Sequence, residues 1–112
     1  MDCIFCEIIK GNIPSTKVYE DESVIAINDL NPQMPTHILI IPKKHIACVN
    51  DITEEDVNLV GHIFFVAKKI AEKLGLENGY RIINNCGKDA GQTVMHLHFH
   101  LLAGSEMGEK IV

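Results

Sequence analysis

One short segment near the C-terminus, residues 94–102, constrains the fold more than any other part of the chain. Its sequence, Val-Met-His-Leu-His-Phe-His-Leu-Leu, alternates histidine with apolar side chains. Successive side chains of a β-strand point to opposite faces of a sheet, so this period of two predicts a strand. One face is expected to carry His96, His98 and His100. The other face is expected to enter a core through the intervening apolar residues, Met95, Leu97, Phe99 and Leu101.

The spacing of the three histidines limits what they can do together. A lone histidine on a strand is usually a surface residue, but three on one face favour a functional site. Same-face neighbours lie about 6.6 Å apart and the outer two about 13 Å apart, whereas zinc needs each ligand nitrogen within about 2.1 Å. Two adjacent histidines can share an ion, so at least one has another task. Because imidazole is a competent nucleophile at phosphorus, the segment indicates a two-step displacement there.

Two polar stretches precede the histidine strand. Residues 84–87 (Asn-Asn-Cys-Gly) and 91–93 (Gly-Gln-Thr) offer amides, a hydroxyl and glycine-exposed backbone donors. These residue types are also common in ordinary turns. Next to three histidines, they are expected to surround a phosphoryl group and stabilise its charge.

The remaining pattern predicts an α+β domain with a mostly antiparallel sheet. Apolar residues at helical spacing predict a short helix over residues 3–10 and one long helix that starts at the capping box of residues 53–56 and ends at Gly75. Strands are expected over the ranges 17–20, 24–28, 37–41, 80–84 and 94–102. The first two form a hairpin, and hairpins ahead of the helix disfavour a doubly wound sheet.

Composition narrows the class of ligand. The chain has 112 residues and a net charge of −5, and its longest basic run is Lys43-Lys44. Nucleic-acid binding needs clusters of basic residues, so we expect a small ligand and no nucleic acid. No stretch approaches the roughly 20 apolar residues that span a bilayer, so we expect no membrane insertion and a cytoplasmic protein, or a nuclear one in a eukaryote.

The cysteines fall into two groups. Cys3 and Cys6 have the Cys-x-x-Cys spacing of metal half-sites and of redox motifs, and metal binding is favoured. Because no second cysteine pair follows, histidines are expected to complete such a site. Cys48 and Cys86 have no evident partner and are expected to be ordinary thiols.

The histidine segment resembles the His-φ-His-φ-His-φ-φ signature of the histidine triad (HIT) family of nucleotide-binding proteins. Other segments resemble the family in the same order, namely 29–33, 35–37, 41–46, 79–81, 91–93 and 102–107. The last of them is more similar to the Hint branch, which includes zinc-bearing, protein kinase C inhibitor-like members, than to the Fhit branch. The resemblance implies one HIT domain over residues 1–112, with a HIT-like fold of about five mostly antiparallel strands, one long helix and a short N-terminal helix.

The same resemblance implies roles for individual residues. His98 matches the nucleophile that forms a nucleotidyl-histidine intermediate, and His100 and His37 match its phosphate-contacting partners. The acidic residue that binds the ribose hydroxyls corresponds to Asp29. The phosphate and leaving-group contacts correspond to Asn85, Gly91, Gln92 and Thr93, the last of which is more often serine in the family. Apolar walls for the base are expected from Ile8, Ile27 and Leu39.

In similar zinc-bearing proteins the ligands that complete the metal site correspond to His45 and His96. A closed site of two cysteines and two histidines would hold a structural Zn²⁺ ion, since it leaves no open position for water. The resemblance also implies a homodimer formed through the long helix and adjoining sheet edges.

The function implied is a purine nucleoside 5′-monophosphoramidase, which acts on a purine nucleoside monophosphate or its phosphoramidate. Three alternatives remain open. They are a dinucleoside polyphosphate hydrolase of the Fhit type, a noncatalytic nucleotide-binding regulatory module, and a metal-dependent hydrolase that uses two of the triad histidines.

Overall fold

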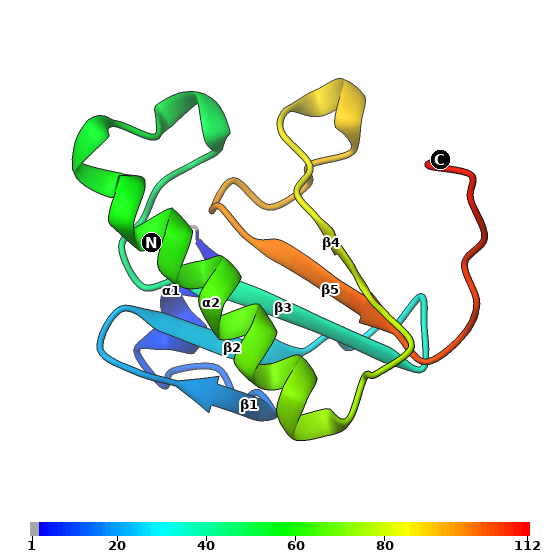
Figure 1. Cartoon of the computed structure of the whole chain (residues 1–112). Coiled ribbons are helices and arrows are strands. Elements are labelled where there is room, and N and C mark those ends of the chain that lie inside the picture. The colour runs from blue at the N-terminus through cyan, green and yellow to red at the C-terminus, as the bar shows by residue number, and fades with distance from the viewer. Residues whose placement is uncertain (1–2) are drawn as a thin grey trace.

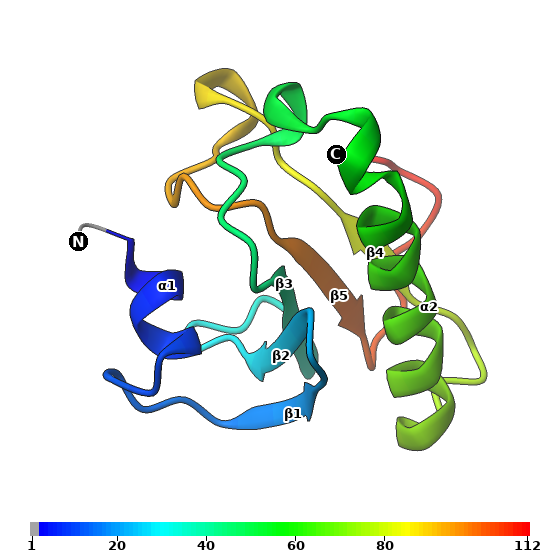
Figure 2. The same ribbon diagram turned by 90° about the vertical axis from the view of Figure 1, so that its left-hand side faces the viewer.

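A computed structural model describes residues 3–112 as a five-stranded antiparallel sheet with a helix on each face (Figures 1 and 2). The strand order is β1-β2-β3-β5-β4, so β1 and β4 are the edges. The elements are α1 (Ile4–Ile9), β1 (Lys17–Glu20), β2 (Val24–Asn28), β3 (Thr36–Pro42), α2 (Val57–Leu74), β4 (Arg81–Ile83) and β5 (Phe99–Ala103). Three short 3₁₀ helices occupy Val49–Asp51, Glu54–Asp56 and Lys88–Ala90. The prediction of an α+β, mostly antiparallel fold is confirmed.

The sheet separates two apolar layers, and Figure 2 shows α1 and α2 on its opposite sides. The α2 layer contains Ile63, Val66 and Ile70 of the helix, packed on inward-facing residues of β2, β3 and β5. The α1 layer contains Phe5 and Ile8, packed on Ile25, Ile27, Leu39 and Ile41. Because β2 and β3 are covered on both faces, they are apolar almost throughout rather than alternating.

The capping box at Thr53 forms as predicted, although the first turn is a 3₁₀ helix that leads into α2. The Thr53 amide donates to Asp56 Oδ2 at 3.0 Å, and the Asp56 side chain is almost fully buried. Lys44 Nζ lies 2.6 Å from Asp56 Oδ1, and this hydrogen bond holds the pKa of the Asp56 carboxyl below its usual value. The contact ties the start of α2 to the segment that carries His45.

The histidine strand begins later than predicted. Strand β5 starts at Phe99, so His96 and His98 precede it and only His100 lies within it. Pairing with β3 stops at Phe99, opposite Ile40, and the same register would put Leu97 opposite Pro42, which has no N–H to donate. The Leu97 amide donates instead to Ile46 O at 2.6 Å.

The predicted alternation survives in part. Leu97, Phe99 and Leu101 are buried in the α2 layer, as expected. Met95 was expected on that face but is 50% exposed, because the chain bends over residues 94–96 before the alternation begins. The strand expected over residues 80–84 is likewise shortened to Arg81–Ile83.

In the described part of the chain, no helix combines the length and the apolar character that crossing a bilayer requires.

Candidate active site and metal cluster

A pocket of about 270 Å³ opens on the α1 side of the sheet, next to the histidine segment. Its walls are mainly apolar, and polar groups converge on it from three different segments. The apolar lining includes Ile8, Ile27 and Leu39, as predicted, and the polar lining consists of Asn28, Asp29, Thr93, His98 and His100. An apolar hollow with a few convergent polar groups is the usual form of a small-molecule site.

His98 is fixed in one orientation by a backbone contact. Its Nδ1 lies 2.7 Å from the carbonyl oxygen of His96, and its ring packs edge-on against Phe5 with centroids 5.0 Å apart. A carbonyl oxygen can only accept, so Nδ1 carries the proton. In the neutral ring the lone pair is therefore on Nε2, at the wall of the pocket.

His37 and His100 form a hydrogen-bonded chain behind His98. The Gln33 amide donates to His37 Nδ1 at 3.0 Å, so the proton of the neutral ring is on Nε2. That nitrogen lies 2.8 Å from His100 Nδ1 and 3.3 Å from Asp29 Oδ2. If His37 donates to His100 Nδ1, the remaining proton of His100 is on Nε2, where it can donate to a ligand.

The charge state of His100 follows from its surroundings. Burial, together with the neighbouring His98 and His37, lowers the pKa of His100 to about 4, and Asp29 opposes the shift. The ring is therefore neutral near pH 7. A neutral His100 can be a hydrogen-bond donor but carries no positive charge.

The loop that carries Asp29 is closed by local contacts. The Asp29 amide donates to the His37 carbonyl at 3.0 Å, and its Oδ1 accepts from the Asn31 amide at 2.8 Å. Gly104 supports the far end of the loop, because its backbone passes directly beneath Pro35. These contacts place the Asp29 carboxylate at the rim of the pocket, beside His37.

The polar loop before the histidines has a structural part and a pocket-facing part. The Gln92 amide group is fully used: Nε2 donates to Ala47 O at 2.8 Å and Val94 O at 3.1 Å, and Oε1 accepts from Gly87 N at 2.9 Å. Thr93, the next residue, lines the pocket.

Three of the predicted phosphate contacts, Asn85, Gly91 and Gln92, are not among the residues that line the pocket. Their contacts with phosphate stay a prediction.

Two groups have a supporting role that the sequence did not indicate. One is the Gln33 amide that orients His37. The other is Asn84, whose Nδ2 donates to the His98 carbonyl at 2.9 Å. The register of β4 with β5 pairs Ile83 with His100, so a sequence-based sheet model with that register would have placed Asn84 near His98. Gln33 acts through its backbone amide, which every residue except proline has, so the residue type at this position gives no hint of the contact.

The second cluster joins Cys3, Cys6, His45 and His96, whose ligand atoms all lie within 4.8 Å of one another. His96 Nδ1 lies 3.2 Å from Cys3 Sγ, 3.6 Å from Cys6 Sγ and 3.1 Å from His45 Nδ1. Cys6 Sγ lies 3.3 Å from His45 Nδ1. His96 Nε2 faces the Pro42 carbonyl at 2.8 Å, which assigns the proton to Nε2 and leaves the Nδ1 lone pair directed at the other three residues.

These distances fit a tetrahedral ion. Bond lengths of about 2.3 Å to sulfur and about 2.05 Å to nitrogen imply edges of about 3.3 Å between two nitrogens and about 3.6 Å between nitrogen and sulfur. The cluster lies within a few tenths of an ångström of these values, and His96 is fully buried. The four residues could hold a metal ion in a closed site, so the first histidine of the segment belongs to this cluster and not to the pocket.

Asp29, His37 and His100 also bring ligand-type atoms close together. Here the nitrogens of His37 and His100 are 2.8 Å apart, which is a hydrogen-bond distance and shorter than the roughly 3.3 Å edge of a zinc tetrahedron. We therefore interpret this group as a hydrogen-bonded chain rather than a metal site.

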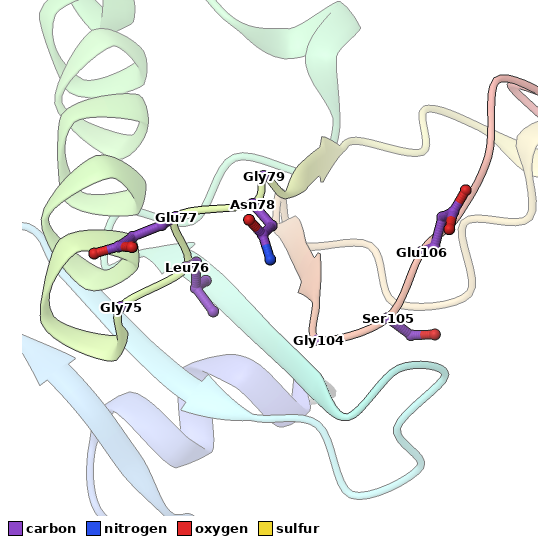
Figure 3. A pocket seen from close by; sticks show the side chains of 8 residues that line it. All are labelled: Gly75, Leu76, Glu77, Asn78, Gly79, Gly104, Ser105 and Glu106. Carbon is purple, nitrogen blue, oxygen red and sulfur yellow. The ribbon is translucent and has the colours of Figure 1, made fainter.

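A larger hollow, of about 490 Å³, lies between the loop after α2 and the loop after β5 (Figure 3). Glu77 and Ser105 point away from one another on its two sides. None of the predicted site residues lines it. Its polar side chains do not converge as they do at the histidine pocket, so it is not the candidate active site.

The fold, the histidine pocket and the Cys-His cluster together define a histidine-triad protein, and the model of the HIT domain matches residues 10–107. The chain belongs to the HIT domain family. It is 48% identical over 108 residues to a purine nucleoside phosphoramidase of Escherichia coli, covering 96% of this chain and 91% of that protein. It is 49% identical over 106 residues to a 14 kDa zinc-binding protein of Zea mays, covering 93% and 83%.

Solved structures agree with the fold. A HIT family hydrolase from Clostridium thermocellum superposes with a TM-score of 0.97 at 57% identity, covering 99% of this chain and 97% of that one. A histidine triad protein from Clostridium difficile gives a TM-score of 0.95 at 54% identity, covering 98% and 96%. The predicted HIT-like fold and family are thus confirmed.

Proposed function

We propose that this protein is a purine nucleoside 5′-monophosphoramidase, which hydrolyses the bond between the phosphorus of a nucleoside monophosphate and an amine. The hydrogen bond between His98 Nδ1 and the His96 carbonyl carries the proposal, because it leaves the Nε2 lone pair free at the pocket wall. The names of the relatives support the reaction class, one being a purine nucleoside phosphoramidase and another a HIT family hydrolase.

The reaction has two displacements at phosphorus. In the first, His98 Nε2 attacks the α-phosphorus, an N–P bond to histidine forms, and the P–N bond to the amine breaks. The amine nitrogen takes a solvent proton, which reaches it through the Thr93 hydroxyl. In the second, water attacks the phosphorus, the bond to His98 breaks, and the nucleoside monophosphate leaves.

His100 acts on the phosphate without being a charged group. Its Nε2–H donates to a phosphoryl oxygen and stabilises the charge that grows there in each transition state. His37 holds His100 in the required tautomer through the 2.8 Å contact, and the Gln33 amide holds His37. Because the His100 ring is neutral, the phosphate can approach it without a change in the protonation of His100 near pH 7.

The nucleotide lies along the pocket with its base between apolar side chains and its phosphate at the histidines. Ile8, Ile27 and Leu39 contact the base, and the Asp29 carboxylate at the rim accepts from the ribose hydroxyls. In the polar loop, Asn85 completes the phosphate site together with Thr93, whereas Gly91 and Gln92, whose N–H donors are all used within the protein, support the loop that carries Thr93.

Cys3, Cys6, His45 and His96 hold a structural Zn²⁺ ion in this proposal. Held by these residues, an ion would cross-link α1, the segment after β3 and the histidine segment, and would take no part in the displacement at phosphorus. The donor set of two thiols and two imidazoles suits zinc, and the zinc-binding relative supports this choice of metal.

Residues 1–112 act as one HIT domain that forms a homodimer. The exposed side of α2 presents apolar side chains, with Val57 60% and Phe65 55% exposed. Within residues 3–112, strand β4 is an edge of the sheet. The backbone groups on its outer side are therefore free to pair with a strand of another chain. A second copy of this chain would cover both features.

The test is hydrolysis of adenosine 5′-monophosphoramidate by the wild type, a His98→Ala variant and a His62→Ala control. His62 contacts Asp21 outside the pocket, so its loss should leave turnover near the wild-type rate. His98→Ala should lower turnover by at least about 10³-fold, since it removes the nucleophile. Turnover by His98→Ala that matches the control would refute the assignment, and faster cleavage of a dinucleoside polyphosphate than of the phosphoramidate would favour the Fhit-type reaction.

A further inference from the structure

Cys48 and Cys86, which were expected to be ordinary thiols without a partner, lie in two segments that meet at the base of the polar loop, and the Cys86 side chain is among the groups that act on the Cys48 thiol. Cys48 precedes the 3₁₀ helix Val49–Asp51, and Cys86 follows β4. The Gln92 amide bridges the residues next to them, donating to Ala47 O at 2.8 Å and accepting from Gly87 N at 2.9 Å. This bridge holds together two segments that are far apart in the sequence.

The two thiols have different surroundings. Cys48 is 9% exposed, and its Sγ lies 3.5 Å from Asp51 Oδ2. A hydrogen bond with the Asn50 backbone lowers the pKa of Cys48, but burial and the neighbouring side chains of Cys86 and Asp51 outweigh it and raise the pKa above its usual value. Cys86 is half-buried and so more accessible. An oxidant from solvent would meet Cys86 first, with Cys48 beside it to react next.

We propose that Cys48 and Cys86 are a reversible dithiol–disulfide site whose oxidation weakens nucleotide binding. With hydrogen peroxide as the oxidant, the Cys86 thiolate attacks a peroxide oxygen, the O–O bond breaks, and a sulfenic acid and hydroxide result. Cys48 then attacks the Cys86 sulfur, passes its proton to the Asp51 carboxylate, and displaces hydroxide as the S–S bond forms. The net change is two thiols and one peroxide giving one disulfide and two waters.

The expected effect on the ligand follows from the position of Gln92. A disulfide brings the two sulfurs to about 2.05 Å, closer than any non-bonded contact, so the two side chains must move together, and we expect the segments that carry them to shift with them. Gln92 hydrogen-bonds both segments, and its neighbour Thr93 lines the pocket. Displacements of about 1 Å in such a site are costly for binding and catalysis. This second half of the inference rests on the proposed function.

The chain allows the disulfide to be mapped without ambiguity. Trypsin cleavage after Lys44, Lys68, Arg81 and Lys88 gives a peptide 45–68 that contains only Cys48 and a peptide 82–88 that contains only Cys86. Cys3 and Cys6 fall together in peptide 1–10. After peroxide treatment and digestion without reductant, mass spectrometry should find 45–68 linked to 82–88, and dithiothreitol should separate them. Finding both peptides unlinked, or linked only to 1–10, overturns the proposal.

Calorimetric titration with AMP tests the effect on binding, with Cys86→Ser as the matched control because it keeps Cys3 and Cys6 equally open to oxidation. Oxidised wild type should bind AMP at least about fivefold more weakly than reduced wild type, and reduction should restore the affinity. Peroxide treatment of Cys86→Ser should weaken AMP binding by less than about fivefold. If the disulfide forms but the affinity for AMP does not change, the proposal that oxidation weakens nucleotide binding is overturned. Failure of the reduced protein to bind AMP overturns the proposed function instead, and the peptide map then still decides whether the disulfide forms.

Discussion

Replacing Gly104 with alanine tests how the loop after β5 supports the active site. Gly104 has φ +99°, a conformation that residues with a Cβ rarely adopt. A Cβ at this position would lie 2.8 Å from Pro35 Cβ and 3.4 Å from Thr36 N. Pro35 closes the loop that begins at Asp29, and Thr36 directly precedes His37. The substitution should therefore displace Pro35 and Thr36, and with them His37, which begins the hydrogen-bonded chain behind His98.

The expected cost has two parts. A positive φ strains a residue with a Cβ by about 1–2 kcal/mol. Forcing a methyl group against Pro35 and the Thr36 backbone adds about 1–3 kcal/mol, as overpacking usually does. Together they lower the free energy of unfolding by about 2–5 kcal/mol. For a domain of this size, each kcal/mol lost lowers the midpoint of thermal unfolding by about 4 °C. A shift of His37 should also reduce kcat by about tenfold or more.

Gly11→Ala is the matched control. Gly11 has φ +83°, but a Cβ there would meet no heavy atom within 4 Å, so only the backbone strain remains. Thermal unfolding by circular dichroism should show the larger loss for Gly104→Ala, and phosphoramidate hydrolysis should fall only in that variant. Equal losses of stability in the two variants, or a Gly104→Ala protein with wild-type kcat, would show that the Pro35 contact does not support the site.

Three further outcomes are expected. The double variant Cys3→Ser, Cys6→Ser should lose stoichiometric zinc by metal analysis and unfold at lower temperature than the wild type, whereas retained zinc would exclude these ligands. Burial opposes ionisation of Asp21, but hydrogen bonds from Tyr19, His62 and two amides hold the pKa of this carboxyl well below its usual range. Its stabilisation should therefore be present above about pH 4 and lost as the pH falls further, so the stability gap between wild type and Asp21→Asn should narrow in acid denaturation; a gap that stays constant down to pH 2 contradicts this. Phe65→Glu places a charge on the exposed side of α2 and should shift the mass measured by light scattering from dimer to monomer, whereas an unchanged dimer would exclude this face as the interface.

Local patterns were enough to predict most of the fold. The hairpin, the capping box at Thr53, the end of α2 at Gly75 and the alternation of Leu97, Phe99 and Leu101 depend on neighbours in the sequence. The start of β5 does not, because it depends on where β3 stops offering a backbone partner. That long-range event is why Met95 was wrongly expected in the core.

The residues of the candidate site were predictable to different degrees. The strand period alone separates the histidines from the core, and spacing alone shows that one metal cannot take all three. Choosing His45 to complete the Cys3–Cys6 pair required the family resemblance, since the ligands come from separate segments. The nearness of Cys48 to Cys86 was missed for the same reason, because the Gln92 bridge that aligns them joins residues far apart in the sequence.

The most direct test of the central claim is to trap the covalent intermediate. Adenosine 5′-monophosphoramidate is mixed with a molar equivalent of enzyme and quenched in alkali within one turnover, since the histidine N–P bond is labile in acid. Tryptic peptide 89–110 contains all three histidines of the segment. Fragmentation should locate one adenylyl group on His98, and the His98→Ala variant should carry none. An adenylyl group on His96 or His100, or full turnover by His98→Ala, would contradict the account.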